Sequence, residues 1–155
     1  MRKTIYIAGP MFSVGEREFN ETVDRYLRGL GHDTFLPQRD GEEMSLLMQS
    51  GMTSVNAAKR VFDFDVNKIK KSDIVVFILD GRVPDDGACV EVGMAYSLGK
   101  ECIGLKTDPR APMHGLDNPM LLGVLRFRVA NTFEELRHLI DEAQVVQVDN
   151  LLLAE

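Results

Sequence analysis

The sequence lacks long apolar runs, and it has few residues that bind metals or form disulfides. No run approaches the length that spans a membrane, and residues 1–4 lead into a β-rich stretch rather than a signal peptide. The two cysteines and three histidines have no metal-ligand spacing and fit no disulfide framework. We therefore expect a cytoplasmic protein without a metal site.

Common fingerprints of nucleotide and hydrolase sites are also missing. The loop that follows the first β-rich stretch, residues 8–12, lacks the G-x-G-x-x-G pattern, and nothing matches a P-loop. Neither a G-x-S-x-G elbow nor a Cys–His nucleophile pair has support in the spacing. These absences disfavour a binding site for a dinucleotide or a nucleoside triphosphate. We expect no cofactor.

Composition limits the partners further. The net charge of −6 disfavours nucleic acid or an anionic membrane as the main partner, which leaves small-molecule substrates. A chain of 155 residues with 45% hydrophobic content is predicted to form one domain, residues 1–155, with a real core. The apolar tail, residues 145–155, is expected to pack on another subunit or back on its own.

Strand-like and helix-like segments alternate along the chain. Short β-rich runs are predicted as strands, and amphipathic stretches with capping or turn signals as helices. The expected strands are residues 4–8, 34–36, 74–79, 102–105 and 127–129, with loops after each. The expected helices are residues 14–29, 42–71 with a break at 50–51, 88–98, a short turn within 116–124, and 133–144. This order predicts an α/β fold, a doubly wound, flavodoxin- or Rossmann-like parallel sheet of about five strands.

Glu91 is the unusual residue within a strand–loop–helix unit that ends at Gly99. The unbroken apolar run 74–79 reads as a strand buried on both faces, and an acidic loop connects it to the helix. Glu91 falls on or beside the apolar stripe of that helix, where a carboxylate is costly unless it is paired. A structural role is one reading. The position near a helix start and past the end of a central strand favours a functional carboxylate.

Other acids are predicted at the same edge of the sheet. Asp65 falls on the apolar stripe of helix 42–71, where either a structural or a functional role would explain it. Asp85 and Asp40 lie on loops. Converging carboxylates suit a reaction that passes through a cation, in which one acid is the nucleophile and another protonates the leaving group. This set of acidic side chains is therefore typical of glycosyl transfer with retention.

Four segments of the chain resemble the nucleoside 2-deoxyribosyltransferase family. They are residues 5–12 (I-Y-I-A-G-P-M-F), 65–73 (D-V-N-K-I-K-K-S-D), 85–93 (D-D-G-A-C-V-E-V-G) and 118–121 (N-P-M-L). They occur in the family's order and at similar spacing. The resemblance implies transfer of 2-deoxyribose between nucleobases through a covalent intermediate.

The resemblance also implies residue roles. Glu91 matches the nucleophile that attacks the anomeric carbon, Tyr6 the phenol that holds it, and Asp65 the acid at the base. Asp85 is similar to the family's sugar-hydroxyl ligand. Asn118 is similar to an asparagine that reaches into a neighbouring subunit's pocket, which implies a homo-oligomer. An ordinary strand tyrosine and an N-P turn residue remain the alternatives for Tyr6 and Asn118.

Further substrate-binding candidates are assigned by position: Gly9, Phe12, Gly87 and Asp40. The family branch that hydrolyses 2-deoxynucleoside 5′-monophosphates is expected to hold phosphate with serine and arginine in the first loop. Pro10 and Phe12 stand in those places here, which favours free nucleosides, although Ser13 and Arg17 lie close enough to receive a phosphate.

Two other functions remain open at this point. One is an N-glycoside hydrolase that acts on deoxynucleotides or deoxynucleosides with water as acceptor. The other, from a different class, is a non-catalytic nucleotide-binding module on the same fold.

Overall fold

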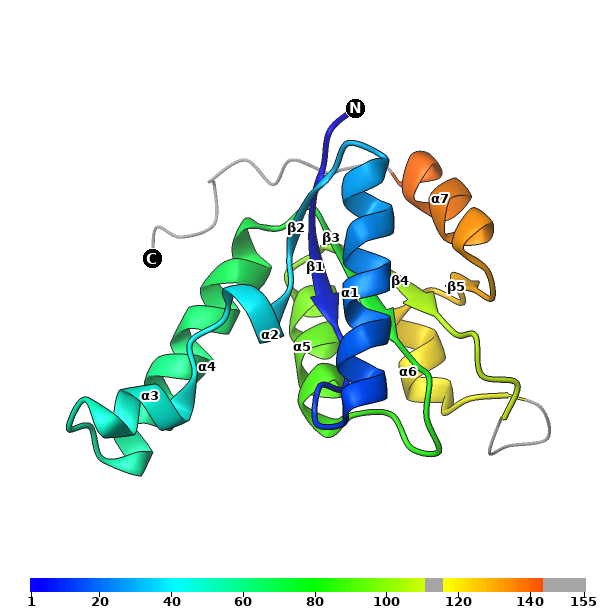
Figure 1. Ribbon diagram of the computed structural model, residues 1–155. Coiled ribbons are helices and arrows are strands. Elements are labelled where there is room, and N and C mark those ends of the chain that lie inside the picture. The colour runs from blue at the N-terminus through cyan, green and yellow to red at the C-terminus, as the bar shows by residue number, and fades with distance from the viewer. Residues whose placement is uncertain (111–115, 144–155) are drawn as a thin grey trace, which may run out of the picture.

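Five parallel strands form a single sheet in the computed structural model, which describes residues 1–110 and 116–143 (Figure 1). The strand order is β2-β1-β3-β4-β5. The strands are β1 Thr4–Ala8, β2 Asp33–Phe35, β3 Ile74–Ile78, β4 Glu101–Leu105 and β5 Val129–Ala130. Since every neighbouring pair is parallel, the expected α/β sheet is confirmed.

Helices cover both faces of this sheet. They are α1 Val14–Gly29, α2 Pro37–Asp40, α3 Met44–Gln49, α4 Ser54–Lys71, α5 Asp86–Ser97, α6 Pro119–Val124 and α7 Phe133–Glu142. The core divides into two clusters, one beneath α1 and α7 and the other beneath α4, α5 and α6. The fold is therefore a doubly wound α/β sandwich.

Alternation along β1 decides which side chains meet which helices. Ile5 and Ile7 join the core beneath α1 and α7, whereas Tyr6 and Ala8 join the core on the α5 side. Tyr6 is completely buried there. A polar hydroxyl is thus carried into the interior between the sheet and α5.

The strand order reverses between β1 and β3, the two central neighbours. The chain leaves β1 for α1 on one face and leaves β3 for α5 on the other, so the two connecting loops diverge (Figure 1). A crevice outside the carboxyl ends of the strands at such a point is where open α/β sheets bind ligands. The candidate residues are expected to gather there.

Helix α5 follows its sequence pattern closely. Its first turn is capped by Asp85, whose Oδ1 accepts a hydrogen bond from the Ala88 N–H at 2.8 Å. Ala88, Val92 and Ala95 are buried against the sheet, as expected. The helix ends before Gly99, whose positive φ of 71° suits a glycine.

Several elements differ from the prediction by one or two residues at their ends, and two differences are larger. The predicted strand 127–129 is wrong in its first part, because Phe127 has a φ of 59° and lies in a turn, so that β5 comprises only Val129–Ala130. The segment expected as a loop after Pro37 instead forms the short helix α2, with the proline at the first helical position, where its fixed φ is favourable.

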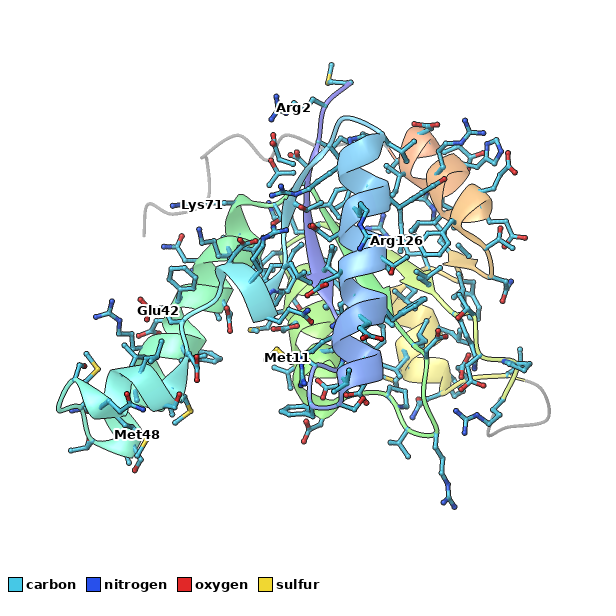
Figure 2. The ribbon with its side chains drawn as sticks, viewed as in Figure 1. Arg2, Met11, Glu42, Met48, Lys71 and Arg126 are labelled. Atoms are coloured by element: carbon cyan, nitrogen blue, oxygen red, sulfur yellow. The ribbon has the colours of Figure 1, made fainter. Side chains whose placement is uncertain are left out.

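Helix α3 and the first turns of α4 project from the body of the protein, and Met48 lies at the far end of this projection (Figure 2). Several large apolar side chains of this arm are exposed to solvent: Met44, Leu46, Met48, Val55 and Phe62. The predicted packing of the tail 145–155 lies outside the described residues. In the described part of the chain, no helix has the length and apolar character needed to cross a membrane.

Candidate active site

The centre of the candidate site is a hydrogen bond between the sheet and α5. The Tyr6 hydroxyl donates to Glu91 Oε1 at 2.6 Å. Burial, followed by the charge of Glu91, raises the pKa of Tyr6 far above its usual range, so the phenol keeps its proton. It is thus a permanent donor that fixes one oxygen of the carboxylate.

Glu91 is itself partly buried, and its neighbours shift its acidity. Burial raises the pKa of its carboxyl to about 7, the Tyr6 hydrogen bond lowers it, and the charges of Asp65 and Asp85 raise it. The charged groups that act on Glu91 are thus acidic, as expected for a shared site rather than for a structural ion pair. Near neutral pH the carboxyl exchanges its proton easily.

Asp65 reaches the same region from α4. Its Oδ1 is buried and has no hydrogen-bond partner among the described residues. Burial raises the pKa of its carboxyl to about 6, and the charge of Glu42 adds to the effect. An unpaired buried oxygen is costly. A bound ligand that offered a hydrogen-bond donor there would remove that cost.

Glu42 is a neighbour of Asp65 that the sequence reasoning missed. The Arg60 guanidinium donates to both of its carboxylate oxygens, at 2.6 and 2.7 Å, and holds it at the base of the projecting arm (Figure 2). This pairing also lowers the pKa of Glu42, which keeps its negative charge beside Asp65. No sequence motif marks it, because an ion pair across 18 positions leaves no periodic signal.

Asp85 and Gly87 lie at the start of α5. One oxygen of Asp85 caps the helix, and its charge reaches Glu91, so the residue is close to the centre of the site. At Gly87, an added Cβ would lie 3.2 Å from Asp85 Oδ1, a tight contact. The structure thus brings four predicted residues together: Tyr6, Asp65, Asp85 and Glu91.

The first loop is held close to β3. A Cβ at Gly9 would lie 3.0 Å from the Ile78 Cβ, so glycine allows the loop to approach that strand. Phe12 is 77% exposed near the end of this loop. Met11, its neighbour, lies beside the end of β1 (Figure 2). Both predicted substrate contacts, Gly9 and Phe12, therefore follow the carboxyl end of β1, the end of the strands at which open α/β sheets bind ligands.

Asp40 is engaged in holding the fold. Its carboxylate accepts from the Arg39 side chain at 2.6 and 2.7 Å and from the Leu36 N–H at 2.9 Å. Arg39 also pairs with Asp24 of α1 at 2.5 Å, which ties α2 to that helix. This geometry gives no support to the expected substrate contact.

Within the described residues, Asn118 makes no hydrogen bond to Glu91. Its side chain caps α6 by accepting from the Met120 N–H at 2.9 Å, and the residue is exposed. It lines a hollow of about 260 Å³ beside the loop after β3, together with Leu79, Gly81, Arg82, Pro84, Arg110 and Asp117. Glu91 is not among these lining residues.

No group of three or more histidine, cysteine, aspartate or glutamate side chains is arranged to hold a metal ion within residues 1–110 and 116–143. The groups that meet at the candidate site are carboxylates and a phenol. One carboxylate is fixed by a buried donor, and a second carries an unpaired oxygen. This arrangement can supply a nucleophile and an acid.

The family comparison agrees with this inventory. The family described as nucleoside 2-deoxyribosyltransferase matches residues 5–148, a range that contains every candidate residue. The chain belongs to this family, whose chemistry concerns the N-glycosidic bond of nucleosides. Among curated protein sequences, none matches the chain significantly.

Solved structures with the same fold include a transferase and a glycosidase. A conserved protein from Enterococcus faecalis is similar at 24% identity and a TM-score of 0.72, over 91% of this chain and 98% of that one. A 2-deoxyribosyltransferase from Bacillus psychrosaccharolyticus is similar at 26% identity and a TM-score of 0.69, over 86% of this chain and 89% of that one. The CMP N-glycosidase of Clostridium botulinum is similar at 16% identity and a TM-score of 0.57, over 90% of this chain and 99% of that one.

Proposed function

We propose that this protein transfers 2-deoxyribose from one nucleobase to another through an ester on Glu91, with retention at the anomeric carbon. The observation that carries the proposal is the Glu91 carboxylate, held by the buried Tyr6 hydroxyl at 2.6 Å with Asp65 nearby. Membership of the family supports the same chemistry.

The first half of the reaction forms the ester. The Glu91 oxygen that Tyr6 does not hold attacks the anomeric carbon, the bond from that carbon to the base breaks, and Asp65 gives its proton to the departing base. A pKa raised to about 6 makes the Asp65 carboxyl a usable acid near neutral pH. In the second half, another base attacks the same carbon, Glu91 leaves, and Asp65 recovers a proton. Two inversions give net retention.

Three further candidates, Asp85, Phe12 and Asn118, bind the substrate in this scheme. Asp85 accepts from a sugar hydroxyl with the oxygen that does not cap α5. Phe12, at the first loop, lies on the base side. Asn118 enters the site of another subunit, a role supported by the exposure of this residue and by the exposed apolar side chains of the projecting arm.

Mixing two inactive variants tests the role of Asn118. Glu91→Ala and Asn118→Ala subunits are each expected to be inactive alone, and to regain turnover when they are unfolded and refolded together. In a mixed oligomer, an intact Glu91 from one chain meets an intact Asn118 from the other. Light scattering of the refolded mixture checks whether an oligomer is present. Absence of recovered turnover in a mixed oligomer would show that each site is built from one chain.

Incubation with a deoxynucleoside, with and without a second free base, tests the reaction type. Transfer is expected to yield a new nucleoside that carries the second base, which chromatography detects. The competing function, an N-glycoside hydrolase, has a structural neighbour in the CMP N-glycosidase, and would yield free deoxyribose at the same rate whether or not the base is present. Release of deoxyribose alone would therefore replace the proposed transfer with hydrolysis.

A further inference from the structure

The Tyr6 ring packs on a phenylalanine of the neighbouring strand. Tyr6 and Phe35 are register partners in β1 and β2, so both side chains leave the same face of the sheet. Their rings stack, with centroids 5.1 Å apart and an angle of 26° between the ring planes. Because Tyr6 is completely buried and Phe35 is nearly so, this stack limits the tilt of the phenol that donates to Glu91.

An ammonium group from α4 lies against the same stack. Lys68 Nζ is 5.2 Å from the centroid of the Phe35 ring and 4.9 Å from that of the Phe64 ring. The centroids of these two rings are themselves 6.0 Å apart. Such distances are typical of cation–π attraction, which draws an ammonium to the electron-rich face of a ring. Lys68 therefore links the two phenyl rings and, through Phe35, reaches the Tyr6 phenol.

A role at the helix end does not by itself account for the position of Lys68. Three lysines, Lys68, Lys70 and Lys71, occupy the last turn of α4, where positive charge is favourable. Lys70 and Lys71 are exposed, whereas Lys68 is half-buried. In the described part of the chain, Lys68 is also the one member of this group whose ammonium lies over aromatic rings. Its charge thus faces the core that contains Tyr6.

We infer that Lys68 is a positioning residue for the proposed reaction. Acting through the Phe35 ring, it keeps the Tyr6 hydroxyl on the carboxylate of the nucleophile. The inference rests on the proposed function, in which the hydroxyl holds one oxygen of Glu91 and leaves the other free to attack. A small change in the tilt of the phenol would therefore slow the chemical step, because the rate depends steeply on the placement of the reacting groups.

Two substitutions of Lys68 separate its charge from its bulk. Methionine keeps an unbranched side chain without the charge, whereas arginine keeps a cation that can lie over the same rings. Lys68→Met is expected to lower kcat about tenfold or more and to keep KM within about twofold, since the nucleophile is affected and substrate binding is not. Lys68→Arg is expected to keep kcat within about threefold of the wild type.

Lys71→Met is the matched control. Lys71 extends away from the protein at the end of α4 (Figure 2), so its loss removes a charge from the same helix end without touching the rings. This variant is expected to leave kcat and KM unchanged.

A double-mutant cycle with Tyr6→Phe identifies the group through which Lys68 acts. Phenylalanine keeps the ring and removes the hydroxyl, so the bond to Glu91 is lost whatever the tilt of the ring. In this background, Lys68→Met is expected to change kcat by less than about twofold. A general weakening of the fold would instead lower kcat by the same factor in both backgrounds.

Proton NMR follows the hydrogen bond without any turnover. A buried hydroxyl proton held by a carboxylate at 2.6 Å exchanges slowly and resonates far downfield. The wild type is expected to show this resonance, and its loss in Tyr6→Phe provides the assignment. Lys68→Met is expected to shift or broaden it, whereas Lys68→Arg and Lys71→Met should keep it.

An unchanged resonance in Lys68→Met, or its absence from the wild type, would overturn the inference. Normal kcat in Lys68→Met, an equal loss in Lys68→Arg or Lys71→Met, or a full loss in the Tyr6→Phe background would do the same. If the wild type turns over no deoxynucleoside, the proposed function fails, while the resonance still decides whether Lys68 holds the Tyr6 hydroxyl in place.

Discussion

Replacing Glu91 by alanine is expected to lower kcat by about 10⁴-fold or more, since loss of the nucleophile removes the covalent route. The neighbouring acids cannot replace it, because Asp65 is needed at the base and one oxygen of Asp85 is committed to the helix cap. Mass spectrometry of the wild type, quenched during turnover, should show a deoxyribosyl adduct on the peptide that contains residue 91.

Glu91→Gln separates loss of chemistry from loss of structure. The amide oxygen can still accept from the Tyr6 hydroxyl, so the packing between the sheet and α5 is kept. Glu142→Gln, at the exposed end of α7, is the matched control and should keep full turnover. Near-normal turnover in Glu91→Ala, or an adduct on another peptide, would remove Glu91 from the mechanism.

Asp65→Asn is expected to lower kcat/KM by about 10²- to 10⁴-fold for nucleosides whose bases leave poorly, and less for those whose bases leave easily. Asparagine keeps the shape of the side chain but cannot give a proton to the base. Asp63→Asn is the control, because Asp63 is an exposed acid two positions earlier on α4. Equal effects on all leaving groups would contradict the acid role.

The pH profile gives a second measure of the same roles. In the proposed reaction Glu91 acts ionised, so activity should rise as pH passes the pKa of about 7 for its carboxyl. Asp65 acts protonated, so activity should fall as pH passes the pKa of about 6 for its own. The wild-type kcat/KM should therefore form a bell with its maximum between these two values, because only the minor form with Glu91 ionised and Asp65 protonated reacts. Asp65→Asn should lose the fall at higher pH.

Much of the fold could be predicted because its signals are local. The apolar run before Asp80 and the spacing of Ala88, Val92 and Ala95 specify β3 and α5 with no knowledge of the rest of the chain. The strand predicted at 127–129 is wrong in its first part, because nothing in the residue types marks the positive φ of Phe127. Backbone conformation of this kind depends on packing around the turn, which a local pattern does not encode.

The site was predictable where a side chain conflicts with its surroundings. Glu91 and Asp65 stand out as acids on apolar helix stripes, and both prove to have raised pKa values. The Tyr6–Glu91 bond joins residues 85 positions apart, so it came from the family resemblance rather than from spacing. The predicted substrate contact of Asp40 gained no support, because the neighbouring Arg39 donates to its carboxylate. The residue types alone do not reveal that pairing.

If Glu91 is the nucleophile, as we propose, the Tyr6–Glu91 bond also makes activity a sensor of complete folding. Its donor comes from the first strand and its acceptor from a helix that is synthesised much later, so the pair can form only once β1 and β3 lie side by side. A partly folded chain that keeps its helices would have no working centre. During denaturation, catalysis should thus disappear no later than the central sheet, and the enzyme would report its own integrity.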